Sequence, residues 1–341
     1  MASGYRIYRI NGRPIFAVPD GRSGVRLAGL ARYQPFTFRR SLYRHVMNLA
    51  IRTNVDQLIS TRAASPLSSS TSFVFEDWLR EIRSEIDQPE ASAVVFWPPQ
   101  SQRQRLYVHL LDSQLNQIGF AKISMDAAND VLLDREASTL NQLAQVRTRF
   151  CRVPVVLSHA TFAGHRYLLM EPLPANALPL PRHAPYPANC VEEYAGTSRD
   201  LPAQSFSTLS WWSTFVGQLH SADEPILTEL EQLTGDRELR VRRGHGDFGP
   251  ANMVRSADCL WIFDWEASSP DAPAHVDALS YELAMRFIKH GARTVEERVR
   301  VEVGYLRQVE DERRPSVLLS LAYLRTVRRD GFRWLISEGQ V

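Results

Sequence analysis

The sequence predicts an α+β protein that has two lobes and an N-terminal extension. The chain has 341 residues, which is enough to bury a sizeable core. Short runs of alternating apolar residues, typical of strands, occupy the middle of the chain. Apolar residues at helical spacing are most frequent in its last third.

The extension begins with a predicted β-hairpin. Tyr5–Ile10 and Pro14–Val18 alternate apolar and polar residues, and they flank Asn11-Gly12, a strong signal for a tight turn. Residues 36–59 carry apolar groups at near-helical spacing. After a Ser-rich stretch, residues 73–87 predict a second helix that stops before Pro89.

A series of predicted strands follows, with one helix among them. The helix covers residues 134–143 and follows the strand that contains Lys122. The connection over residues 98–105 contains two prolines and no glycine, which is unusual for a loop that approaches phosphate closely. The predicted strands are Val94–Trp97, Leu106–Leu111, Gln117–Ile123, Pro154–Leu157 and Tyr167–Met170.

The most informative motif is His245-Gly-Asp247-Phe-Gly-Pro-Ala-Asn252. Asp264 lies twelve residues after Asn252 and directly follows the apolar run Leu260–Phe263. Phosphoryl transfer needs a carboxylate that orients the attacking hydroxyl and oxygen ligands that hold Mg²⁺. Asp247 suits the first task, and Asn252 and Asp264 suit the second.

Lysine is rare in this chain. Of forty basic residues, only Lys122 and Lys289 are lysines. Arginine bias of this kind leaves lysine where a compact ammonium cannot be exchanged for a planar guanidinium. Lys122 lies in a predicted strand and Glu136 in the following helix. The alternative interpretation is a lysine at a strand edge and a solvated glutamate.

The motif and this strand–helix pair resemble the aminoglycoside phosphotransferase and choline kinase family. The resemblance implies a two-lobe protein-kinase-like fold, with an N-lobe at residues 91–172 and a C-lobe at 173–341, preceded by an extension at 1–90. It implies ATP or GTP and Mg²⁺ as cofactors and a small-molecule hydroxyl as acceptor. Lys122 would clamp the phosphates and Glu136 would position Lys122. The backbone of Glu171 and Leu173 would face the base.

The chain departs from the family pattern in two places. Gly249 and Ala251 stand where histidine and glycine are common, and the loop at 98–105 lacks glycine. Ser101, Arg103 and Arg105 are candidates for phosphate contacts in its place. These departures leave open a non-catalytic nucleotide-binding pseudokinase.

Composition excludes several other classes of protein. The net charge of +2 is too small to indicate nucleic acid as a partner. The three cysteines are widely spaced, which predicts neither a disulfide framework nor a metal site. The sequence shows no membrane-spanning run and no secretory leader, so a cytoplasmic protein is expected.

The extension is strongly basic. Residues 1–60 contain ten arginines and only two acids, Asp20 and Asp56, a local net charge of +8. One interpretation is a contact with an anionic membrane surface or an acidic partner. The other is a helix that packs on the body of the protein while its arginines face solvent.

The acceptor is expected to be a sugar or glycan. The resemblance implies that C-terminal helices build the acceptor pocket, and these helices are rich in arginine, which suits a neutral or anionic acceptor. His220 is a candidate acceptor contact, although a buried structural histidine is the alternative. A polycationic aminoglycoside is the competing acceptor. The arginines are Arg313, Arg314, Arg325, Arg328, Arg329 and Arg333.

Overall fold

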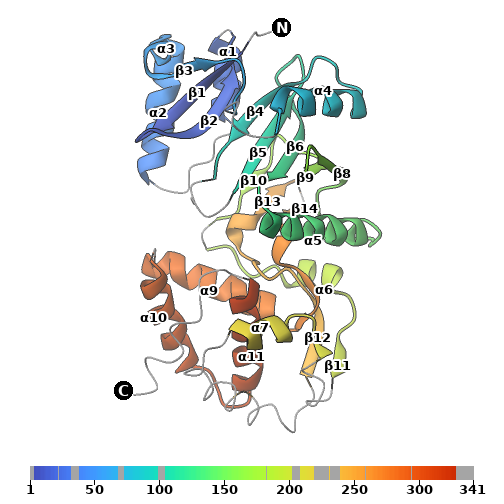
Figure 1. Cartoon of the computed structure of the whole chain (residues 1–341). Helices are drawn as coiled ribbons and strands as arrows, with labels where there is room; N and C mark the ends of the chain where they lie inside the picture. Colours follow the sequence, from blue (N-terminus) through green and yellow to red (C-terminus); the bar gives the residue numbers. More distant parts are fainter. Residues whose placement is uncertain are drawn as a thin grey trace. The chain divides into compact units, whose positions relative to one another are not determined.

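The structure is a computed structural model of the whole chain, and it divides into two compact units (Figure 1). The N-terminal unit comprises residues 1–137 and 155–175, and the C-terminal unit comprises 138–154 and 176–341. The structure describes residues 4–21, 23–31, 38–67, 73–98, 104–181, 183–201, 208–218, 230, 239–257, 259–292 and 294–327.

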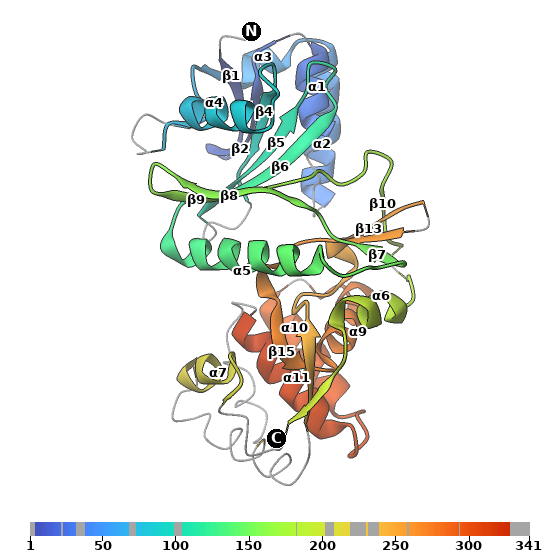
Figure 2. The ribbon, with the colours of Figure 1, turned by 90° about the vertical axis from the view of Figure 1, so that its right-hand side faces the viewer.

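One antiparallel sheet forms the framework of the N-terminal unit. Within the described residues, eight strands lie in the order β3-β1-β2-β4-β5-β6-β9-β8 (Figures 1 and 2). The predicted hairpin is confirmed, because Asn11 and Gly12 adopt φ values of 50° and 76° between β1 and β2. The strands are β1 Tyr5–Ile10, β2 Arg13–Pro19, β3 Thr61–Ala63, β4 Ser92–Phe96, β5 Arg105–Leu111, β6 Gln117–Ser124, β8 Val156–Phe162 and β9 His165–Met170.

The extension is part of this sheet and not a separate domain. β2 pairs with β4 through Phe16 opposite Phe96 and Ala17 opposite Val95. The sheet therefore continues across residue 90, where the sequence predicted a domain boundary. The two units divide within α5, between residues 154 and 155, and after residue 175.

Helices cover both faces of the sheet (Figure 2). On one face, Tyr8, Phe16 and Val94 pack with residues of α1 and α2, and on the other face Ile7 and Ala17 pack with α4. Alternate side chains of one strand point to opposite faces, so both faces of the hairpin are apolar. The helices are α1 Ser23–Ala31, α2 Phe38–Arg52, α3 Asp56–Ile59, α4 Phe75–Glu85 and α5 Ala127–Leu143.

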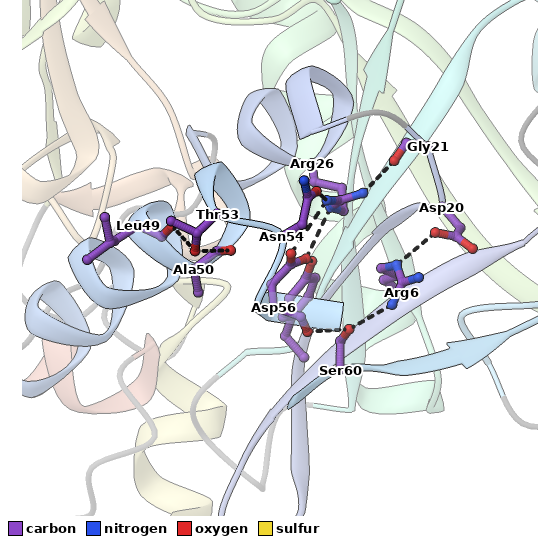
Figure 3. Close-up of polar contacts among 11 residues, drawn as sticks. Arg6, Asp20, Gly21, Arg26, Leu49, Ala50, Thr53, Asn54, Asp56 and Ser60 are labelled. Atoms are coloured by element: carbon purple, nitrogen blue, oxygen red, sulfur yellow. Dashed lines mark hydrogen bonds and ion pairs between the residues drawn. The ribbon is translucent and has the colours of Figure 1, made fainter. Parts of the chain in front are cut away.

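A buried polar network fixes the turn that follows α2 (Figure 3). Arg26 forms an ion pair with Asp56 at 3.0 Å, with both side chains buried, and also donates to Asn54 at 2.6 Å. Tyr8 donates its hydroxyl to Asp56 at 2.6 Å. A buried charge is tolerated when it is paired and hydrogen-bonded, as here. Part of the arginine charge of the extension is therefore structural.

The C-terminal unit combines two small sheets with a helical core. In the described part of this unit, the sheets have the orders β10-β13-β14-β7 and β11-β12-β15. Helices α7, α9 and α11 bury Phe215, Leu279, Leu283, Leu321 and Tyr323 in one cluster. The strands are β7 Cys151–Arg152, β10 Leu178–Pro179, β11 Arg199–Leu201, β12 Leu239–Gly244, β13 Met253–Ser256, β14 Cys259–Ile262 and β15 Ser269–Pro273.

Two helices of this unit are single 3₁₀ turns at predicted site residues. The turn η3 ends at Asn252, and the turn η4 begins directly after Asp264. The three cysteines are free, as the sequence predicted. No helix in the described residues is long and apolar enough to cross a bilayer. The helices are α6 Ala188–Ala195, α7 Trp212–Gln218, η3 Pro250–Asn252, η4 Trp265–Ala267, α9 Val276–His290, α10 Val295–Leu306 and α11 Arg314–Val327.

Candidate active site

The loop that carries Asp247 follows β12 and makes a tight turn. Gly246 has φ +81°, and a Cβ atom at this position would lie 2.4 Å from the carbonyl oxygen of Ala267. Only glycine fits both the dihedral angle and the close approach. His245 is fully buried, its Nδ1 accepts the backbone N–H of Asp247 at 3.2 Å, and its Nε2 donates to the carbonyl oxygen of Phe263 at 3.0 Å. His245 is thus a scaffold of the loop.

Asp277, in the first turn of α9, holds the start of this loop. Its carboxylate accepts the backbone N–H of His245 at 3.0 and 2.9 Å and that of Gly246 at 3.1 Å. Tyr194 donates its hydroxyl to the same carboxylate at 2.6 Å. Burial and the charge of Asp277 raise the pKa of Tyr194 well above 10, so its hydroxyl remains a donor.

The residues after Asp247 are fixed by packing. Phe248 is fully buried, and its ring lies 5.9 to 6.1 Å from the rings of Tyr194 and Tyr281. A Cβ atom on Gly249 would lie 3.3 Å from the Cβ of Ala284 on α9. A side chain at position 249 would therefore press on α9. Asp247 itself is half-buried between these anchored neighbours.

Asn252 contacts Asp247 directly. Its Nδ2 donates to the carboxylate Oδ2 of Asp247 at 3.0 Å and to the backbone carbonyl of Asp247 at 2.8 Å. The five-residue spacing and the 3₁₀ turn η3 fold the segment back so that the two side chains meet. With Nδ2 used in this way, Oδ1 of Asn252 is the atom that could bind a cation.

The β13–β14 hairpin places Asn252 and Asp264 at the same end. Asn252 precedes β13 and Asp264 follows Phe263 after β14. Met253 pairs with Ile262, and the N–H of Phe263 donates to the carbonyl of Asn252 at 3.1 Å. Antiparallel pairing therefore brings together two residues that are twelve positions apart in sequence. Asp264 adopts a left-handed conformation, φ 68° and ψ 55°, as the chain turns into η4.

The oxygen donors at this end of the hairpin suit a magnesium ion. Glu266, which is buried, has a carboxylate oxygen within 4.8 Å of one of Asp264. Mg²⁺ prefers carboxylate and amide oxygens and keeps several waters. Asp264 and Asn252 could therefore hold the ion, and Glu266 is a further candidate that the sequence reasoning did not identify.

In the N-terminal unit, Lys122 and Glu136 form a buried ion pair. Nζ of Lys122 lies 2.8 and 2.7 Å from the two carboxylate oxygens of Glu136, and the residues are 4% and 0% exposed. β6, which carries Lys122, lies between β5 and β9, with Lys122 opposite Tyr107 and Leu168. Lys122 is therefore not at a sheet edge. A buried ion pair is weak evidence for stability, because the cost of removing both charges from water offsets their attraction.

Glu171 and Leu173 follow β9 in the same unit. The backbone N–H of Glu171 donates to the carbonyl of Val155 at 2.9 Å, and its side chain accepts the N–H of Val155, also at 2.9 Å. These two bonds fix the chain as it leaves the sheet. The backbone carbonyl of Glu171 and the N–H of Leu173 are the groups that could meet a base.

Arg105, a candidate phosphate contact from the sequence, has a structural role instead. It is 2% exposed, and its guanidinium donates to Oδ1 of Asn129 at 3.1 and 2.8 Å. Asp126 in turn accepts from the side chain of Asn129 at 2.7 Å. Arg105 thus joins β5 to the start of α5 and is unsuited to a phosphate contact. Ser101, Arg103 and His220 lie outside the described residues.

The comparisons with known proteins give distant structural matches. No protein-family model matches the sequence, and no curated protein matches it either. An aminoglycoside phosphotransferase, APH(4)-Ia, in a ternary complex with ADP and hygromycin B, is 11% identical, covering 78% of this chain and 92% of its own, with a TM-score of 0.47. A Plasmodium vivax ethanolamine kinase is also 11% identical, covering 94% and 90%, with a TM-score of 0.35.

A third similar structure is an aminoglycoside phosphotransferase in complex with GDP and kanamycin. It is 12% identical, covers 75% of this chain and 99% of its own, and has a TM-score of 0.35. These proteins are of the kind that the motif around Asp247 resembles.

Proposed function

We propose that this protein is an ATP-dependent phosphotransferase that moves the γ-phosphoryl group to a hydroxyl of a small molecule. The observation that carries the proposal is the arrangement of Asp247, Asn252 and Asp264. A carboxylate held in a fixed loop is hydrogen-bonded to Asn252, and Asn252 lies at the same end of a hairpin as Asp264. These are the groups that phosphoryl transfer requires from a protein.

The chemistry assigned to the loop is simple. The acceptor oxygen bonds to the γ-phosphorus, the bond from that phosphorus to the β–γ bridging oxygen breaks, and the hydroxyl proton passes to the carboxylate of Asp247. The hydrogen bond from Asn252 orients the carboxylate of Asp247 for this task. A bound Mg²⁺ would neutralise charge on the phosphates.

Lys122 is assigned to the phosphates of the nucleotide. The two oxygens of Glu136 hold its ammonium, which keeps the charge in a defined place within the sheet. The carbonyl of Glu171 could accept from an exocyclic amine and the N–H of Leu173 could donate to a ring nitrogen. This pattern suits adenine, so ATP is the first choice of donor and GTP the second.

The acceptor is proposed to be a neutral sugar or glycan. Arg325, one of the arginines that favoured an anionic acceptor, is buried and paired with Glu302. It is therefore not available to a substrate. Arg313 and Arg314 lie at the start of α11 directly after Glu310, Asp311 and Glu312, so the charges of this segment nearly balance, as suits a neutral acceptor.

A ³²P-transfer screen tests this function. Wild-type protein is incubated with γ-labelled ATP or GTP, Mg²⁺ and panels of sugars, glycolipids, aminoglycosides and amino alcohols, with Asp247→Asn as the control. Mg²⁺-dependent label on a sugar, absent in the variant, is the expected result. Label on an aminoglycoside would favour the antibiotic kinase. Nucleotide-dependent thermal stabilisation without turnover on any acceptor would favour the pseudokinase.

The contact of the basic N-terminal segment with a membrane or an acidic partner stays a prediction from the sequence. It concerns residues 1–60, which include neither Asp247 nor Lys122. A test of phosphoryl transfer therefore neither supports nor weakens it.

A further inference from the structure

The segment from Leu42 to Ile59 exposes an unusual number of large apolar side chains. Of the fifteen such side chains exposed in the described residues, six lie in these eighteen positions. Their exposed fractions range from 49% to 83%. We call this set the α2–α3 surface: Leu42, Val46, Leu49, Val55, Leu58 and Ile59.

On α2 the exposed residues form one stripe. Leu42, Val46 and Leu49 are spaced by four and three residues, so they lie above one another on one side of the helix. Met47 and Ile51 on the opposite side are 1% and 0% exposed and pack in the core of the N-terminal unit. In the described part of α2, the inner side therefore packs in the core, and the outer apolar stripe lies outside it.

The sequence around the stripe contains basic residues and no acids. Residues 21–55 contain seven arginines and His45 but no aspartate or glutamate. His45 and Arg52, each three residues after a member of the stripe, are exposed on the same helix. The flanking acids, Asp20 and Asp56, already accept from Arg6 and Arg26 (Figure 3). They therefore do not offset the positive charge of α2.

We propose that the α2–α3 surface docks the protein on an anionic phospholipid membrane. A basic helix with an apolar stripe buries the stripe at the level of the headgroups while its cationic side chains meet anionic lipids. A symmetric contact with a second copy is disfavoured, because it would place the same acid-free segment against itself. The proposal does not depend on the phosphotransferase activity.

Vesicle sedimentation tests the proposal with the full chain. The probes are vesicles of phosphatidylcholine alone and of phosphatidylcholine with about a third phosphatidylserine. We expect binding to the second kind only, weakened by added salt. The variant Leu42→Ser, Val46→Ser, Leu49→Ser should reduce the partition coefficient at least about tenfold, because the buried apolar area is lost.

A matched variant separates this effect from a general loss of surface hydrophobicity. Val131, Val155 and Leu157 are 58%, 47% and 44% exposed in the same unit, and their triple serine variant should bind vesicles like wild type. Thermal melting of both variants verifies that they fold. Absent binding of wild type to the anionic vesicles would overturn the proposal, as would equal loss in both variants. A concentration-dependent dimer that is lost only in the α2 variant would also overturn it and identify a second copy as the occupant.

Discussion

Asn252 donates its side-chain amide to the carboxylate of Asp247 at 3.0 Å, and a second bond at 2.8 Å goes to the backbone carbonyl of the same residue. The pair closes a loop that Asp277 and His245 hold from the other side. The carboxylate of Asp247 is therefore fixed before any substrate arrives. Such preorganisation lowers the entropy that a reaction must lose when its groups are aligned.

We expect Gly246→Ala to destabilise the protein and to lower activity. The new Cβ would lie 2.4 Å from the carbonyl oxygen of Ala267, in addition to the strain of a positive φ. The matched control is Gly164→Ala, where φ is +83° and a Cβ would meet nothing within 4 Å. The control should lose about 1 kcal/mol and Gly246→Ala clearly more, measured by denaturant unfolding. Equal losses would show that the contact with Ala267 relaxes freely.

Asp277 is expected to support the loop and not the chemistry of the reaction. Tyr194→Phe removes one hydrogen bond to the buried carboxylate and should destabilise the protein by about 1–2 kcal/mol while kcat changes little. Asp277→Ala leaves the N–H groups of His245 and Gly246 without an acceptor and should lose about 3 kcal/mol or more. Urea unfolding checks both values. An Asp277→Ala variant as stable as Tyr194→Phe would contradict this role.

Asp264→Ala should remove the Mg²⁺ dependence of nucleotide binding. Asp264 and Asn252 lie at one end of the β13–β14 hairpin and are the proposed ligands. Calorimetric titration of nucleotide with and without Mg²⁺ measures the effect, and Glu192→Ala, at an exposed carboxylate, is the control. An unchanged Mg²⁺ effect in Asp264→Ala would remove this residue from the metal site.

Lys122→Arg should raise the nucleotide KM or reduce kcat at least about tenfold, equivalent to about 1.4 kcal/mol. The site is buried and the two oxygens of Glu136 already surround the ammonium, so a longer planar guanidinium cannot take the same place. Lys289→Arg is the matched control, since Lys289 is exposed in the last turn of α9. Wild-type kinetics for Lys122→Arg would show that this lysine has no special role.

Much of the site could be predicted because its signals are local in sequence. The turn Asn11-Gly12 and the alternation of the central strands depend on neighbouring residues only. The pair Lys122 and Glu136 follows from one strand and the next helix, and the structure confirms its contact. The five-residue spacing from Asp247 to Asn252 is likewise contained within one loop.

Other features could not be predicted, because they depend on packing between distant segments. Asp277 lies in the first turn of α9, but its contacts lie with His245 and Tyr194, 32 and 83 residues away. The pairing of β2 with β4 joins the extension to the main sheet and has no local signal. Arg105 resembled a phosphate ligand by position, and only its burial beside Asn129 shows a structural role.

The rate of Asp247→Asn is the most direct test of the central claim, that Asp247 orients the acceptor in phosphoryl transfer. Label transfer from γ-³²P ATP, or hydrolysis to water in the absence of an acceptor, is measured beside nucleotide affinity for wild type and variant. We expect the rate to fall by about 10²–10⁴-fold while the affinity stays nearly unchanged, because the carboxylate acts on the attacking group and not on the nucleotide. A variant that keeps a rate within about threefold of wild type would contradict the assignment.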